Sequence, residues 1–178
     1  MMVAKNDHAH QYLSDQLADR SLSRIYHALV LGVPLPIKAS IDRPIGRHKH
    51  HRTKMSVMSN KPRDARTHYK VLESFGEGCA LVECKLESGR THQIRVHMEA
   101  LGHPLIGDPL YGPQRTALIS KIKNAGYSAD FIRELIAVER PMLHAHVIKF
   151  LHPKTEKEMT FTCDMPEDMS NILKTLRK

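Results

Sequence analysis

The order of its elements predicts an α+β fold for this chain. Strand-like and helical segments follow one another without the regular alternation of strand and helix that a parallel α/β sheet requires. Two strand-like runs, 67–75 and 79–86, flank Gly76-Glu77-Gly78, the turn chemistry of an antiparallel hairpin. The 178 residues suffice for one domain with its own core. We therefore expect a single α+β domain over residues 1–178.

The remaining elements follow from caps and periodicity. Residues 1–5 resemble the end of a strand, and Asn6 or Asp7 can cap a helix that ends near Arg20. Residues 24–31 are apolar, partly β-branched and stop at Gly32, so we expect a buried strand. The further predicted strands are 143–151 and 158–163, and the further helices are 116–125, 128–138 and a last one that Pro166 opens.

Positive charge dominates the composition. Lys and Arg outnumber Asp and Glu by 27 to 19, which gives a net charge of +8 and favours a polyanionic partner. The segment 33–62 has four prolines and weak periodicity, so we expect an exposed loop that contacts RNA phosphates. Its His-Lys-His-His run lacks a neighbouring acidic residue or thiol and fits no zinc spacing, which argues against a metal. The expected RNA contacts are Arg43, Arg47, Lys49, Arg52 and Lys54.

The cysteines and the hydropathy pattern indicate the compartment. Cys79, Cys84 and Cys163 are odd in number and form no C-x-x-C pair, as expected of reduced thiols in the cytoplasm. No apolar run approaches the roughly 18 residues of a membrane span. We expect a soluble cytoplasmic monomer that binds neither membrane nor metal.

The stretch 88–112 combines a turn, a short helix and a Gly/Pro-rich loop. Ile94, Met98 and Leu101 recur at helical spacing, and Gly102 and Pro104 end the helix, so we predict it over 91–101.

A second face of this predicted helix carries His92, Arg95 and Glu99. Arg90 lies at the helix N-terminus, where unpaired backbone N–H groups and the dipole favour a phosphate. The alternative is a solvated polar face with no ligand.

Several segments of the chain resemble one known family. The run Gly-Arg-Thr-His-Gln-Ile-Arg-Val-His at 89–97 and the run Gly-His-Pro-Leu-Ile-Gly-Asp-Pro-Leu-Tyr-Gly at 102–112 are similar to the signature of the RluA/RluD-type ribosomal large-subunit pseudouridine synthases. Residues 23–30, 65–69 and 142–145 resemble further segments of the family. The resemblance implies the pseudouridine synthase fold, with a mixed, mainly antiparallel sheet, and isomerisation of uridine in 23S ribosomal RNA without cofactor or metal.

The resemblance also implies roles for individual residues. Tyr26 would pack on the flipped uracil, Leu143 would form an apolar wall of the base pocket, and Arg95 would pair with the catalytic aspartate and lower its pKa. The matched signature adds Arg90, His92 and Gln93 as substrate contacts.

The family's nucleophile has no counterpart in this chain. It belongs to a His-Arg-Leu-Asp segment that precedes Val-Ala-Lys in the family, and Val3-Ala4-Lys5 is where the resemblance begins here. The family's N-terminal S4-type domain is likewise not matched. Asp108 resembles the aspartate of a structural turn. We therefore expect an N-terminally truncated synthase domain that is inactive alone, with Arg95 lacking its partner.

Two other functions remain open on the sequence alone. One is a non-catalytic module that binds RNA or the ribosome through the basic segment. The other is a metallohydrolase, suggested only by the 13 histidines.

Overall fold

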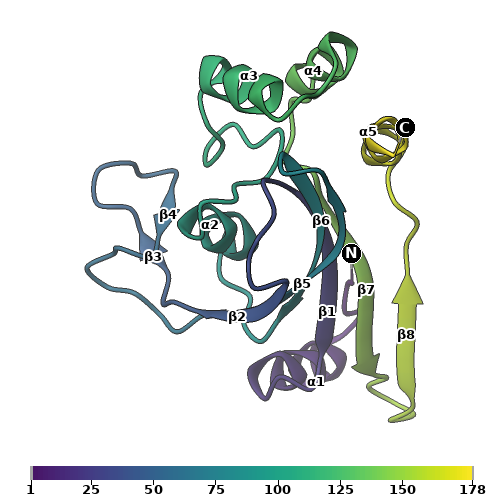
Figure 1. Cartoon of the computed structure of the whole chain (residues 1–178). Helices are drawn as coiled ribbons and strands as arrows, with labels where there is room; N and C mark the ends of the chain where they lie inside the picture. The colour runs from purple at the N-terminus through teal and green to yellow at the C-terminus, as the bar shows by residue number, and fades with distance from the viewer. Residues whose placement is uncertain (1, 178) are drawn as a thin grey trace.

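The computed structural model describes residues 2–177 and confirms the α+β class (Figure 1). Six strands form one sheet in the order β2-β5-β6-β1-β7-β8, and every pairing among the described strands is antiparallel, in agreement with the expected mainly antiparallel sheet. The strands are β1 (Ser23–Leu31), β2 (Lys38–Asp42), β5 (Arg66–Phe75), β6 (Cys79–Leu86), β7 (Leu143–Leu151) and β8 (Glu158–Thr162).

Helices cover both faces of the central strand β1. Its side chains alternate between two apolar clusters, one on each face of the sheet. Ala28 and Val30 face α2 (Gln93–Ala100), whose Ile94 and Met98 are buried against the sheet. Leu29 on the opposite face joins a cluster with α3 (Arg115–Asn124), α4 (Ala129–Ile136) and α5 (Glu167–Leu176). Figure 1 shows α2 against the concave side of the curved sheet, with α3 and α4 at one end.

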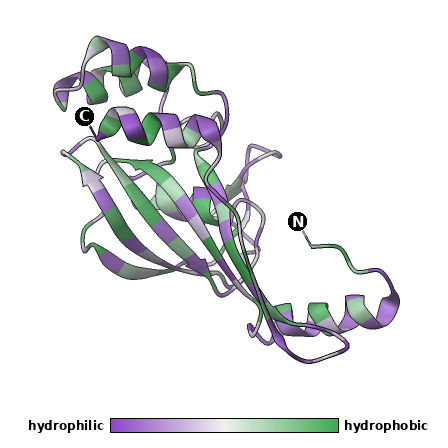
Figure 2. Ribbon diagram, turned by 90° about the vertical axis from the view of Figure 1, so that its right-hand side faces the viewer, coloured by the Kyte–Doolittle hydropathy of each residue, from purple (hydrophilic) through white to green (hydrophobic). Residues whose placement is uncertain are grey.

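The N-terminal helix agrees with the sequence prediction, but the strand before it does not form. Helix α1 (Asp7–Ala18) begins where Asn6 Oδ1 accepts the Ala9 N–H at 2.8 Å. It projects beyond the tapered end of the sheet (Figure 2). Residues 2–5 have no strand geometry, and Val3 is 72% exposed. The apolar sequence alone does not make a strand, because a strand needs a hydrogen-bonded neighbour and no described strand pairs with this segment. Met1 lies outside the described residues.

The basic segment has more structure than a loop. It contains β2, which pairs with β5 at the edge of the sheet, and a small two-stranded unit of β3 (Gly46–Arg47) and β4 (Met55–Ser56). Reciprocal backbone hydrogen bonds of 2.9 Å between Ile45 and Arg63 close its base. We refer to residues 43–63 as the basic arm.

The remaining elements match the sequence prediction to within a few residues. The hairpin of β5 and β6 turns at Gly76-Glu77-Gly78, and the predicted helix at 91–101 is shorter, over Gln93–Ala100. Pro166 occupies the N-cap position of α5, directly before its first residue Glu167. In residues 2–177 no helix has the length and apolarity to cross a membrane.

Candidate nucleic-acid interface

Arg95 on α2 has a partner within this chain. Its Nε and Nη2 donate to the two carboxylate oxygens of Asp108, each at 2.7 Å. The Asp108 side chain is fully buried and that of Arg95 is 14% exposed. The expectation of an unpaired Arg95 is therefore wrong, because the loop after α2 returns Asp108 to the helix.

Asp108 also organises its own turn. Its Oδ1 accepts the N–H groups of Leu110 and Tyr111 at 2.9 and 3.0 Å, as the sequence predicted for a structural aspartate. Burial acts to raise the pKa of this carboxyl, but the hydrogen bonds from Arg95 and the two backbone groups outweigh it and hold the pKa below its ordinary value. Asp108 is thus an ionised structural group.

Tyr111 connects α2 with the basic arm. Its hydroxyl accepts the Met55 N–H at 2.8 Å and lies 2.9 Å from His92 Nδ1. The Arg95 guanidinium carbon lies 4.9 Å from the centre of its ring. Burial and the neighbouring Arg95 lower the pKa of His92, so this imidazole is neutral at pH 7 and its Nδ1 can accept a hydrogen bond from the Tyr111 hydroxyl. His92 is therefore a neutral polar group at the surface between α2 and the basic arm.

Gln93 and His97 are internal residues that join α2 to the sheet and the arm. The Gln93 amide donates to Arg66 O and Thr67 Oγ1, both at 3.0 Å, and the residue is 2% exposed. His97 lies 2.9 Å from Thr67 Oγ1 and 2.8 Å from Arg43 O. We do not include Gln93 among the residues proposed to contact RNA, since its amide is used inside the fold.

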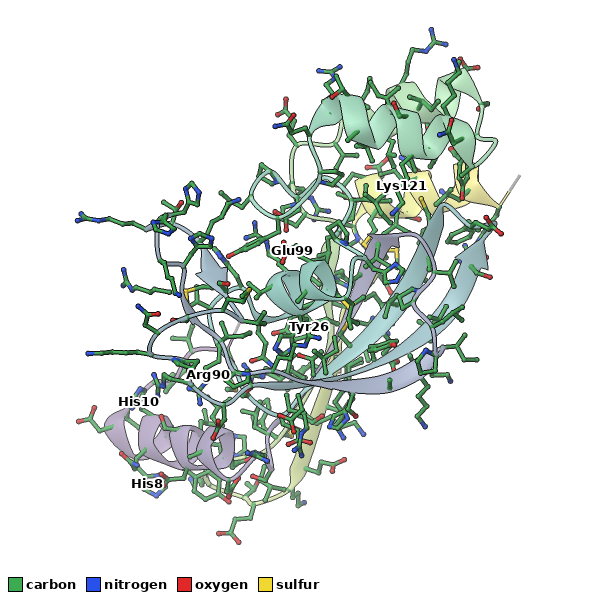
Figure 3. All side chains as sticks on the ribbon, turned by 60° about the vertical axis from the view of Figure 1, so that its left-hand side comes forward. His8, His10, Tyr26, Arg90, Glu99 and Lys121 are labelled. Carbon is green, nitrogen blue, oxygen red and sulfur yellow. The ribbon has the colours of Figure 1, made fainter. Side chains whose placement is uncertain are left out.

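Tyr26 lines an open pocket on the same face of the sheet as α2. The cavity has a volume of about 510 Å³, and no Asp or Glu is among its described lining residues. Tyr26 and Leu143 both pack against the apolar cluster beneath α2. Figure 3 labels Tyr26 beside α2 and Arg90 on the side towards α1. Arg95 does not line this pocket, because it points to Asp108.

The pocket also contains residues to which the sequence assigned no role. Phe161 is 52% exposed and stacks on Phe150 with 5.9 Å between ring centroids. Arg24 lies two residues before Tyr26 on β1 and shares its face, a placement that strand alternation alone could have indicated. His146 lines the pocket at a β-bulge, and no sequence pattern predicts the position of this bulge.

The five cations expected to bind RNA lie on the arm. Arg43, Arg47, Lys49 and Arg52 are exposed and Lys54 is half-buried, with its Nζ 5.9 Å from the Tyr111 ring centroid. No ion pair between described residues involves any of them. Arg90 donates from Nε to Asp64 O at 3.1 Å beside the arm. Across residues 2–177 no cluster of His, Cys, Asp and Glu has the grouping of a metal site.

We predict that Asp108→Asn destabilises the protein by about 3 kcal/mol at pH 7, since it leaves Arg95 without its counter-charge. A folded-state pKa below the ordinary value stabilises the fold above about pH 4, and this stability is lost as pH falls through the folded-state pKa. The loss measured by urea unfolding should therefore shrink in acid.

Asp168→Asn is the matched control for this variant, because Asp168 forms a bidentate pair with Arg140 in which both side chains are over two-fifths exposed. It should cost at most about 1 kcal/mol. Equal losses at the two positions would contradict a structural role for the buried pair.

Comparison with known proteins identifies the family of the chain. A family profile described as RNA pseudouridylate synthase matches residues 1–100. The chain is 40% identical over 187 residues to RNA pseudouridine synthase 2, chloroplastic, of Arabidopsis thaliana, covering 100% of this chain and 44% of that protein. It is 42% identical over 179 residues to ribosomal large subunit pseudouridine synthase D of Pseudomonas aeruginosa, covering 100% of this chain and 53% of that protein.

The solved structure of human RNA pseudouridylate synthase domain containing 4 superposes with a TM-score of 0.69 at 26% identity, over 94% of this chain and 67% of that one. The chain spans about half the length of the curated relatives it matches. Because the family profile covers more than half of the chain, this protein belongs to the RNA pseudouridylate synthase family.

Proposed function

We propose that this chain forms the uridine-binding and RNA-binding part of a pseudouridine synthase that acts on large-subunit ribosomal RNA. The observation that carries the proposal is the open pocket at Tyr26, which combines aromatic walls with a basic rim. A base that leaves its stack needs an apolar pocket with an aromatic face to receive it. The ribosomal target is supported by the name of the Pseudomonas aeruginosa relative.

We further propose that the chain alone binds RNA without turnover. The pocket at Tyr26 has no carboxylate among its described lining residues, and the buried Asp108 is held by Arg95 and two backbone N–H groups. Arg95 remains a proposed catalytic residue, since its Nη1 makes no hydrogen bond to a described residue and could pair with a second carboxylate. We also propose a cytoplasmic location and a monomeric state, as the cysteine content and charge suggest.

The turnover test uses ribosomal RNA labelled with tritium at C5 of uridine, because forming the new bond at C5 releases that hydrogen. We expect salt-dependent binding of the RNA by this chain and no release of tritium above background. Tritium release by this chain would contradict the proposal that it binds RNA without turnover, and absence of RNA binding at low salt would contradict the proposed function itself.

The pocket residue Tyr26 should contribute through its ring. Tyr26→Ala is expected to weaken binding of a uridine-rich single-stranded RNA by about 1–3 kcal/mol, the usual value of one stacked base. Tyr26→Phe retains the ring and should bind like the wild type in fluorescence anisotropy. Equal weakening by both variants would assign the contact to the hydroxyl, and no weakening by Tyr26→Ala would remove Tyr26 from the interface.

The basic arm should supply salt-dependent affinity. Replacing Arg47 and Arg52 together with Gln removes two exposed cations, and the slope of log affinity against log salt for single-stranded RNA should fall by about 1.4. The double replacement of Arg115 and Arg133 with Gln removes the same charge from α3 and α4 and should leave the slope nearly unchanged. An equal fall of the salt slope in both double variants would show that the net charge of the protein, and not a contact of the basic arm with RNA, determines the slope.

A further inference from the structure

Arg24 is placed beside Tyr26 at the mouth of the pocket. The two residues alternate on one face of β1, where Arg24 lies opposite Ile148 of β7 and Tyr26 lies opposite Ala145. Both line the cavity of about 510 Å³. A ligand that rests on the Tyr26 ring therefore brings its neighbouring groups to Arg24.

Arg24 has a buried hydrogen-bond donor that no residue of 2–177 satisfies. Its Nε is a buried nitrogen with no hydrogen-bond partner among the described residues. None of the ion pairs within residues 2–177 involves it, and no carboxylate of that part of the chain lines the pocket. Arg24 as a whole is half-buried, but its buried Nε lacks a partner, which is costly, and an acceptor that arrives with a ligand would remove that cost.

Gly89 leaves room for the guanidinium. A Cβ at Gly89 would lie 2.9 Å from Nη1 and 3.0 Å from Nη2 of Arg24, closer than side chains pack. The guanidinium group is thus held against the turn that leads from β6 into α2, next to Arg90 in the sequence. An arginine at an aromatic pocket that no described carboxylate lines suits a phosphate, and the planar fork of Arg binds phosphate oxygens in bidentate fashion.

We propose that Arg24 binds a phosphodiester group of the RNA strand whose uridine packs on Tyr26. Arg24 is then a positioning residue, which fixes the backbone on one side of the flipped nucleotide while the pocket holds the base. This inference rests on the proposed function, because it requires an RNA strand at the Tyr26 pocket. The phosphate supplies the acceptor that the buried Nε lacks.

The test measures binding of a uridine-rich single-stranded RNA as a function of salt. Arg24→Gln should weaken binding roughly tenfold, within the usual range for a charge-assisted hydrogen bond, and lower the salt slope by about 0.7, the value of one phosphate contact. Arg24→Lys should restore the slope without the full affinity, because an ammonium group lacks the fork. Arg133→Gln on α4 is the matched control and should change neither quantity.

A second variant displaces Arg24 without removing its charge. Gly89→Ala requires the far end of this flexible side chain to move, and Gly89 does not have a positive φ, so the fold should remain intact by circular dichroism. We expect Gly89→Ala to weaken RNA binding as Arg24→Gln does, and the two changes combined to be no worse than either alone. Wild-type affinity and slope in both single variants would overturn the proposal.

RNA with neutral methylphosphonate linkages tests whether Arg24 binds a phosphate of the RNA backbone. If Arg24 binds the backbone, the difference between wild type and Arg24→Gln should disappear when the phosphates of the RNA are replaced by methylphosphonates. A difference of the same size on both RNAs would overturn the phosphate assignment and indicate a carboxylate partner or a purely structural role. Failure of the wild-type protein to bind either RNA at low salt would instead contradict the proposed function.

Discussion

The buried ion pair between Arg95 and Asp108 is the constraint on which the candidate interface depends. It fixes the loop after α2 against the helix, and Asp108 in turn holds the N–H of Tyr111. Tyr111 then carries the constraint outward to Met55 in the basic arm. Because such a pair stabilises only when both charges are hydrogen-bonded, the four contacts to Asp108 act as one unit.

Helix α2 connects this ion pair with the pocket, because one face of the helix packs on the sheet and the other contacts the loop. Ile94 and Met98 pack on the sheet within the cluster that also supports Tyr26 and Leu143. The opposite face bears Arg95 and is tied to the loop. His97 adds a third connection, from the helix to the backbone of Arg43 at the base of the arm. The arm and the pocket are therefore held by one short helix, and neither depends on a long flexible linker.

The sequence predicted the fold well where local patterns determine the structure. Strand alternation, the Gly76–Gly78 turn and the apolar face of α2 are local signals, and the corresponding elements form. The partner of Arg95 was missed because the 13-residue separation from Asp108 is closed by a Gly/Pro-rich loop whose path no periodicity encodes. Gln93 belongs to the matched signature, but its side chain is buried and its amide donates to Thr67 of β5, a residue distant in the sequence. Its motif position alone could not distinguish a structural amide from a binding one.

The positive charge of the chain has two physically different forms. The cations of the arm are largely exposed, so water and salt screen them, and in the proposed function they would attract RNA without selecting a position on it. Arg24 has a buried Nε, and its terminal nitrogens lie against Gly89, so the phosphate that we propose to bind there would be fixed in both distance and direction. A reaction that rotates one base out of its stack requires both properties, because long-range attraction concentrates RNA at the surface and a defined backbone contact aligns one nucleotide with Tyr26. The net charge of +8 therefore does not describe the proposed interface by itself, because in that proposal one partly buried guanidinium determines the register of the strand that several exposed cations leave open.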